Sequence, residues 1–177
     1  MTIRRLILMR HAKSSWKVQG QNDFDRPLKK RGRKNARQAA KTLVDLGWSP
    51  DYSLLSPSCR TRETFEEMAP LLENFLYPDT RESLYHPTVE GIADEVRSID
   101  SEVESLLLIS HNPACEEFLS LLIPESESMK TAAMALLEIK ASTWAEAVAR
   151  NTWWNFQRGS IRWHLSHFFT PTNQYRP

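Results

Sequence analysis

Two arginines and two histidines stand at or shortly after the ends of segments that read as buried strands. They are Arg10, His11, Arg60 and His111, which follow the segments 2–9, 51–55 and 106–110. Because an open α/β sheet places its active site at the carboxyl ends of its strands, we expect these side chains to meet in one pocket. Arginine binds two phosphate oxygens at once, and an imidazole among cations keeps its neutral, nucleophilic form. The pattern predicts phosphoryl transfer through a phosphohistidine.

Strands and helices alternate along the chain and would position these residues. We predict strands at 2–9, 51–55, 106–110, 133–139 and 160–165, and helices at 28–46, from 58 to a stop at Pro70, at 88–99 and at 113–122. Gly47 suits the end of the first helix, and Asn112 suits the N-cap of the last, with Pro113 in its first turn. This alternation is typical of a three-layer α/β/α protein with a mostly parallel central sheet. We expect one compact domain over residues 1–177.

Charge is unevenly distributed, although the net charge is only +1. Residues 1–50 carry a net +10, residues 51–128 carry −13, and residues 129–177 carry +4. Much of the first excess lies on one face of the predicted helix 28–46. That face is either solvated and balanced by the acidic segment, or it meets an acidic partner or a phosphorylated substrate. The near-neutral total and the lack of a nucleic-acid motif argue against nucleic-acid binding.

Short apolar runs and few cysteines limit the class of protein. No run approaches the roughly 20 residues of a membrane helix, and the N-terminus has no apolar signal core. Cys59 and Cys115 are too few for a disulfide framework or a cysteine-rich zinc site. We therefore expect a cytoplasmic protein that uses no metal ion and no cofactor and has no membrane partner.

Three segments resemble the motifs of a known family in their order and distribution. Residues 8–16 (LMRHAKSSW), residues 56–64 (SPSCRTRET) and the pair 110–111 (SH) resemble the histidine phosphatase superfamily, which contains the cofactor-dependent phosphoglycerate mutases. The short chain and the segment 25–28 (DRPL), followed by Gly32, resemble its SixA branch, the phosphohistidine phosphatases. The resemblance implies a phosphoglycerate mutase-like fold.

The resemblance also implies a role for each matching residue. His11 would take the phosphoryl group, Arg10 and Arg60 would bind its oxygens, and His111 would donate a hydrogen bond to it. Water would then hydrolyse the phosphoenzyme. Arg26 would stand at the pocket mouth as a further phosphate or substrate contact. Other candidates for substrate binding lie in the loop after the nucleophile, at Ser14, Trp16 and Lys17.

Two positions depart from the family pattern or bear on the substrate. Ala12 stands where the superfamily usually has glycine, and a Cβ fits there if the backbone does not need a positive φ. Glu82 lies in the stretch where phosphomonoesterases of the superfamily carry a general acid. An alkoxide leaving group gains greatly from such an acid, whereas an imidazole needs it less. Because no acid is placed clearly, the sequence favours a phosphohistidine substrate.

Three functions are consistent with these residues. We predict a metal-independent phosphatase that removes phosphate from protein phosphohistidine through a phosphohistidine intermediate on His11. One alternative is a phosphatase for a small ester, such as a sugar or nucleotide phosphate. The other is an adaptor without catalysis that binds phosphate and uses the cationic helix as its interface.

Overall fold

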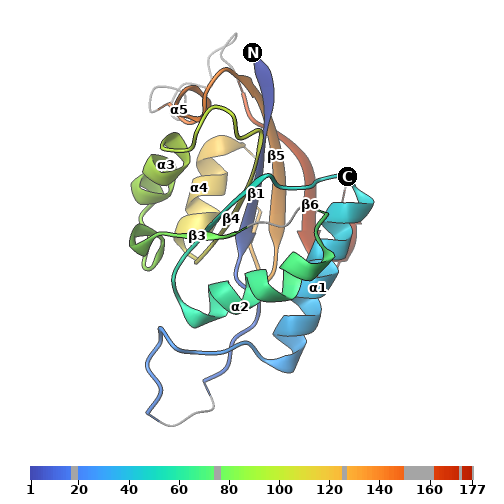
Figure 1. Cartoon of the computed structure of the whole chain (residues 1–177), viewed down its shortest axis with the longest axis vertical. Coiled ribbons are helices and arrows are strands. Elements are labelled where there is room, and N and C mark those ends of the chain that lie inside the picture. Colours follow the sequence, from blue (N-terminus) through green and yellow to red (C-terminus); the bar gives the residue numbers. More distant parts are fainter. Residues whose placement is uncertain (17–19, 74–76, 125–126, 150–161, 172, 177) are drawn as a thin grey trace.

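A seven-stranded sheet forms the centre of the described part of the molecule (Figure 1). The computed structural model describes residues 1–16, 20–73, 77–124, 127–149, 162–171 and 173–176. The strands are β1 (Thr2–Arg10), β2 (Tyr52–Leu55), β3 (Asp79–Thr80), β4 (Ser105–Ser110), β5 (Met134–Ala141), β6 (His164–Thr170) and β7 (Asn173–Arg176). Their order is β3-β2-β4-β1-β5-β6-β7. The first four strands in this order pair in parallel, and the pairings from β1 through β5 and β6 to β7 are antiparallel.

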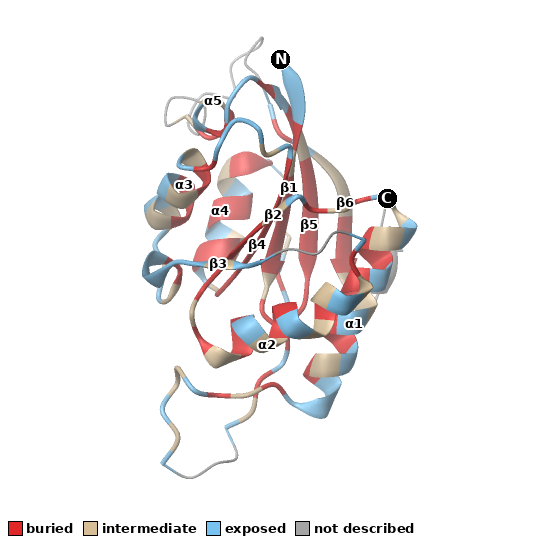
Figure 2. Ribbon diagram, viewed as in Figure 1, coloured by how far each residue is buried: buried red, intermediate tan, exposed pale blue. Residues whose placement is uncertain are grey.

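The two central strands are apolar on both faces because helices cover both faces. Residues 6–9 of β1 and 106–109 of β4 are fully buried, as expected for parallel strands inside a three-layer fold. Side chains alternate across a strand, so Leu6 and Leu8 belong to one core while Ile7 and Met9 belong to the other. Figure 2 shows this buried centre running through the sheet.

Each face of the sheet has its own helices. These are α1 (Lys30–Asp45), α2 (Cys59–Met68), α3 (Val89–Arg97), α4 (Ala114–Leu122) and the short α5 (Trp144–Ala147), with 3₁₀ turns at Ala69–Leu71 and Glu82–Leu84. Helices α1 and α2 pack against one core, and α3, α4 and α5 pack against the other. The predicted three-layer α/β/α fold is confirmed. Within the described residues, no helix combines the length and apolar character needed to span a bilayer.

The C-terminal half contains α5 and β7, which were not predicted, and it differs from the prediction at the last predicted strand and at the start of α4. The last predicted strand, 160–165, is found as β6 at His164–Thr170, and its start at 160–161, like Trp153 and Trp154, lies outside the described residues. Asn112 does not cap α4, because Pro113 is the N-cap residue and the helix begins at Ala114. The amide of Asn112 instead donates to the Glu116 carboxylate and to the Met129 carbonyl oxygen.

Helix α1 ends as predicted and begins in close contact with the loop after β1. Gly47, with φ of +67°, follows the end of α1 and donates its N–H to the Val44 carbonyl oxygen. At the other end, Lys29 N–H donates to the Lys13 carbonyl oxygen over 2.8 Å. A Cβ at Gly32 would collide with that same oxygen. Glycine at 32 therefore lets the first turn of α1 lie against the segment that follows Arg10 and His11.

Candidate active site

The four residues at the predicted strand ends line one pocket of about 420 Å³. Its described lining consists of Arg10, His11, Asp23, Arg26, Arg60, His86, Pro87, His111, Asn112 and Pro113. Two further arginine or histidine side chains, Arg26 and His86, belong to this lining, and Arg26 was predicted at the pocket mouth. The pocket therefore combines three arginines and three histidines with a single carboxylate, that of Asp23.

Parallel pairing of β1 with β4 brings the two central histidines together. Arg10 lies opposite Ser110 in the register of these strands, so the next residue of each strand leaves the sheet at the same edge. His11 N–H donates to the Ser110 carbonyl oxygen over 3.1 Å, and the ring centroids of His11 and His111 are 5.1 Å apart. Arg60 reaches the same edge because α2 begins just after β2.

His11 is held as a neutral imidazole with one free ring nitrogen. Its Nδ1 lies 2.7 Å from the Ala12 carbonyl oxygen, which can only accept, so Nδ1 carries the proton and Nε2 keeps its lone pair. Burial, helped by the charges of Arg60 and Arg10, lowers the pKa of His11 to about 3. The hydrogen bond to Ala12 acts in the opposite direction but does not outweigh burial. The imidazole is therefore unprotonated at Nε2 at neutral pH, which is the state that nucleophilic attack requires.

His111 lines the same pocket, and the contact of one ring nitrogen decides whether the other can donate a hydrogen bond. Its Nε2 lies 2.7 Å from the Ser56 Oγ, and its buried Nδ1 has no hydrogen-bond partner among the described residues. Burial, followed by the charges of His11 and Arg60, lowers the pKa of His111 to about 2. If the Ser56 hydroxyl donates to Nε2, Nδ1 carries the proton of the neutral ring. A buried donor without a partner is suited to a phosphoryl oxygen.

Hydrogen bonds to backbone carbonyl oxygens and to Asp23 fix the positions of Arg10 and Arg60. Arg10 Nη1 donates to the Met129 carbonyl oxygen over 3.0 Å. Arg60, which is only 4% exposed, donates from Nη1 to the Asp23 carbonyl oxygen over 2.6 Å and from Nη2 to the Asp23 Oδ2 over 2.9 Å. The buried Nε atoms of both Arg10 and Arg60 have no partner among the described residues. Both guanidinium groups therefore keep donor capacity for an anion.

Asp23 is the residue of this pocket that sequence reasoning missed. Its carboxylate accepts from Arg60, from Arg26 Nε over 2.9 Å and from the Tyr85 hydroxyl over 3.0 Å. Burial raises the pKa of Asp23, but the Tyr85 hydrogen bond and the charges of Arg60 and Arg26 outweigh it and lower the pKa. Asp23 is thus a carboxylate ion that neutralises two arginines. Its position in a polar loop carried no periodic signal that would have marked it.

The loop residues predicted to bind substrate do not line this pocket in the described part of the chain. Ser14 is buried and forms an isolated bridge with Leu28. Trp16 is 68% exposed, with the Arg26 guanidinium carbon 3.7 Å from its ring centroid, so it lies against a lining residue and outside the described lining itself. Lys17 lies outside the described residues.

Glu82 is not brought into the pocket. It is exposed, in the 3₁₀ turn Glu82–Leu84, and does not belong to the described lining. His86 lines the rim instead, with a φ of +52° and its ring centroid 4.1 Å from that of Tyr85. The turn therefore directs the residues after Leu84 toward the pocket and leaves Glu82 in solvent.

Ala12 fits the position where the superfamily usually has glycine. It is absent from the described residues with positive φ, and its side chain is fully buried. Its N–H donates to the Thr64 Oγ1 over 3.0 Å, and this hydroxyl donates to the Arg60 carbonyl oxygen over 2.6 Å. Ala12 thereby ties the segment after β1 to the helix that carries Arg60.

A family model matches the part of the chain that carries two of the four residues at the strand ends. The model of the histidine phosphatase superfamily (branch 1) matches residues 6–105, which include His11 and Arg60 and amount to more than half of the chain. The chain belongs to the histidine phosphatase superfamily. Within this superfamily, it is 36% identical over 155 residues to an uncharacterized chloroplastic protein of Arabidopsis thaliana, a match that covers 82% of this chain and 71% of the relative. Because that relative is chloroplastic, a cytoplasmic location stays a prediction.

Solved structures confirm the fold and the similarity to the SixA branch of the histidine phosphatase superfamily. The "putative phosphohistidine phosphatase SixA" of Agrobacterium tumefaciens is 27% identical, with a TM-score of 0.76 over 95% of this chain and 98% of that one. A protein histidine phosphatase SixA complexed with tungstate shares the fold at 20% identity, with a TM-score of 0.74 over 95% and 97% of the two chains. A mycobacterial glucosyl-3-phosphoglycerate phosphatase shares it at 17% identity and a TM-score of 0.61, over 93% and 97%. These findings support a phosphatase and leave its substrate open.

Proposed function

We propose that the chain is a phosphohistidine phosphatase that works through a phosphohistidine on His11. The observation that carries the proposal is the free Nε2 of a neutral, buried His11 in a pocket with three arginines. A neutral imidazole can attack phosphorus, and fixed cations stabilise the charge on the transferring group. The guanidinium groups of Arg10 and Arg60 supply that charge, so the proposed reaction uses no metal ion.

The proposed reaction has two displacement steps. His11 Nε2 attacks the phosphorus and forms a P–N bond while the P–N bond to the substrate imidazole breaks. The leaving nitrogen keeps the electron pair and takes a proton from solvent. Water then attacks the phosphorus, the bond to Nε2 breaks, and inorganic phosphate leaves while Nε2 regains its lone pair. Arg60 and the Nδ1–H of His111 bind phosphoryl oxygens in both steps.

The single carboxyl group of the described lining supports an imidazole leaving group. Asp23 is ionised, because Tyr85, Arg60 and Arg26 lower its pKa, and an ionised carboxylate has no proton to give. Glu82 is exposed and outside the lining. An alkoxide would therefore leave without a proton donor, which commonly lowers the rate by about 10²- to 10⁴-fold. An imidazole is a better leaving group and needs protonation less. The proposed substrate is accordingly a protein phosphohistidine.

The test compares phosphate release from a phosphohistidyl phosphotransfer domain with release from sugar and nucleotide phosphates, all with a chelator present. We expect fast release from the phosphohistidine, no effect of the chelator, and an acid-labile phosphoenzyme. His11→Ala should lose at least about 10⁴-fold in turnover because it removes the nucleophile, and circular dichroism checks that the variant is folded.

Each other outcome contradicts a named part of the proposal. Preference for a small ester would overturn the phosphohistidine substrate and keep the mechanism. Undiminished turnover by folded His11→Ala would overturn the intermediate on His11. Binding of phosphate without any turnover by the unmodified protein would favour the adaptor.

A further inference from the structure

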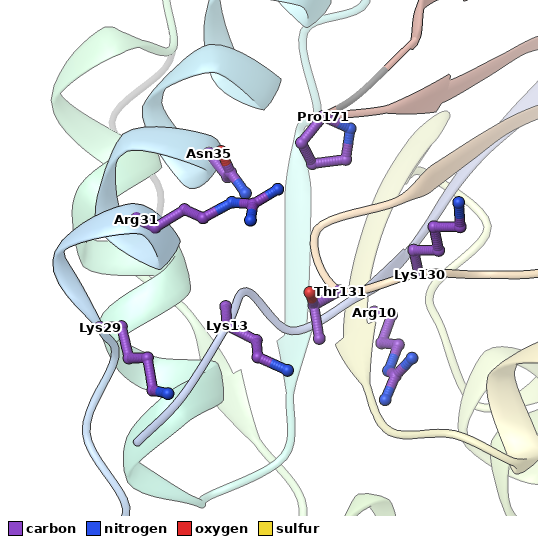
Figure 3. A pocket seen from close by; sticks show the side chains of 8 residues that line it. All are labelled: Arg10, Lys13, Lys29, Arg31, Asn35, Lys130, Thr131 and Pro171. Atoms are coloured by element: carbon purple, nitrogen blue, oxygen red, sulfur yellow. The ribbon is translucent and has the colours of Figure 1, made fainter.

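A second cavity, of about 560 Å³, adjoins the catalytic pocket and is strongly cationic. Figure 3 shows the side chains around it, which come from the end of β1 and the loop after it, the N-cap and first turns of α1, the segment before β5 and the segment after β6. The described lining is Arg10, Lys13, Lys29, Arg31, Asn35, Lys130, Thr131 and Pro171. Five of these eight residues are cationic and none is acidic.

The cations of this second cavity lack the partners that neighbouring cations have. On the same helix α1, Arg33 forms ion pairs with Glu63 and Glu67, and Arg37 pairs with Glu67. In contrast, the exposed side chains Lys13, Lys29, Arg31 and Lys130 form no ion pair with any described residue. The acidic residues Glu63 and Glu67 of α2 thus neutralise Arg33 and Arg37 and leave the cations at the start of α1 uncompensated.

The start of α1 adds to the positive potential of this cavity. Lys29 is the N-cap residue, it makes no side-chain capping bond, and the first turn contains no acidic residue. Helix N-termini carry partial positive charge and are stabilised by acidic side chains, so a lysine and an arginine there repel the helix dipole. An external anion at this place would relieve that repulsion.

Arg10 places the second cavity next to the phosphoryl site. It lines both cavities and precedes His11 in the chain. Aromatic side chains, on which a nucleobase could stack, are missing from the described lining. All four unpaired cations are exposed, as suits a surface that meets another protein through charge.

We propose that this second cavity is a docking site for an acidic segment of the substrate protein, whose carboxylates bind Lys13, Lys29, Arg31 and Lys130 while its phosphohistidine enters the catalytic pocket. The proposal rests on the proposed function and names a feature of its substrate. Complementary charge of this kind raises the association rate and the specificity more than the turnover number. The acidic segment of the substrate therefore raises kcat/KM more than it raises kcat.

The test uses two phosphohistidine peptides that differ only in three residues beside the phosphohistidine, Glu in one and Gln in the other. The unmodified protein should cleave the Glu peptide with a kcat/KM about fivefold to tenfold higher, because several exposed charge pairs add up, and high salt should erase the preference. In Lys29→Glu/Lys130→Glu the preference should disappear. The matched control is Lys34→Glu/Lys41→Glu, which makes the same change of charge at two exposed positions of α1 outside the cavity lining and should keep the preference.

Two further measurements separate this proposal from the proposed function. Turnover of phosphoramidate, which has no acidic segment, should be the same in all variants and tests the catalytic pocket alone. Fluorescence anisotropy with the unphosphorylated Glu peptide measures docking even if no peptide is cleaved, and binding should weaken about fivefold in Lys29→Glu/Lys130→Glu.

Three results would overturn the docking site. One is equal kcat/KM for the two peptides with equal anisotropy binding. Another is a preference that persists in Lys29→Glu/Lys130→Glu. The third is faster cleavage of a small bisphosphate than of its monophosphate, lost in Lys29→Glu/Lys130→Glu, together with no preference for the Glu peptide. That result would assign the cavity to a second phosphate group.

Discussion

The two cavities that share Arg10 hold their positive charge in different ways. In the catalytic pocket, Arg60 and Arg26 are buried and share the Asp23 carboxylate, and two histidines are kept neutral. In the second cavity the cations other than Arg10 are exposed and form no ion pair with a described residue.

The difference follows from the cost of burying charge. A buried arginine without a counter-charge loses its hydration with nothing in return, whereas an exposed lysine keeps its water. The buried cations are thereby held in one geometry, which suits transition-state stabilisation. The exposed cations are free to adjust, which suits recognition of a variable partner. Three variants or conditions separate these two kinds of site.

The largest expected effect comes from Arg60→Ala in the catalytic pocket. We expect kcat/KM to fall by about 10²- to 10³-fold with every substrate, since a preorganised donor to the phosphoryl group is lost. Arg60→Lys keeps the positive charge but cannot donate two parallel hydrogen bonds to the phosphoryl oxygens, so it should recover only part of the loss. Steady-state kinetics with phosphoramidate measure both variants. A fall confined to acidic peptides would place Arg60 with the docking cations and remove the distinction between the cavities.

The next effect concerns stability at low pH. His11 and His111 have an unfolded-state pKa of 6.5 and folded-state values of about 3 and about 2. Between these values the unfolded chain binds more protons than the folded chain, so stability decreases as the pH falls below 6.5. Each histidine should remove about 2 kcal/mol between pH 8 and pH 5.

Urea unfolding at the two pH values measures this loss. His11→Asn/His111→Asn should lose clearly less stability on acidification than the unmodified protein. Lys130→Ala, in the second cavity, serves as the control and should lose as much as the unmodified protein. An identical loss in all three proteins would contradict the neutral, buried state of the two histidines.

The smallest effect is expected from Asp23→Asn. Asp23 competes with an incoming anion for the donors of Arg60 and Arg26. Replacing the carboxylate by a neutral amide weakens this competition by about one charge-assisted hydrogen bond, and inorganic phosphate should bind about tenfold more tightly. Isothermal titration calorimetry measures this affinity. Weaker binding would show instead that Asp23 serves mainly to position Arg60.

Much of the site was predictable because it lies on the most regular part of the fold. The strands β1 and β4 can be recognised in the sequence by their continuous apolar runs, and parallel pairing brings the residues after them to one edge of the sheet. Arg10, His11 and His111 therefore meet where the sequence places them. Arg60 joins them because its helix starts directly after β2.

The loops could not be predicted in the same way. Asp23 meets Arg60 across 37 positions of the chain, and nothing periodic in the polar loop marks that contact. Glu82 has the carboxyl group of a general acid and lies in the segment where the superfamily carries one. A 3₁₀ turn nevertheless leaves Glu82 exposed, and His86 lines the pocket instead. The ionic partners of α1 are likewise decided by packing, because Glu63 and Glu67 of α2 reach Arg33 and leave Lys29 alone.

Local residue types thus suffice for the strands β1, β2, β4 and β5, for the helices α1 to α4 and for the four residues at the strand ends, because hydrophobic periodicity is a local property. The superfamily follows from the same segments. The counter-ion of the arginines, the tautomer of His11 and the separation of paired from unpaired cations are decided only in the folded chain. Each of them depends on a distance between residues far apart in sequence or on burial, and the free energy of a charge is set by its surroundings in space.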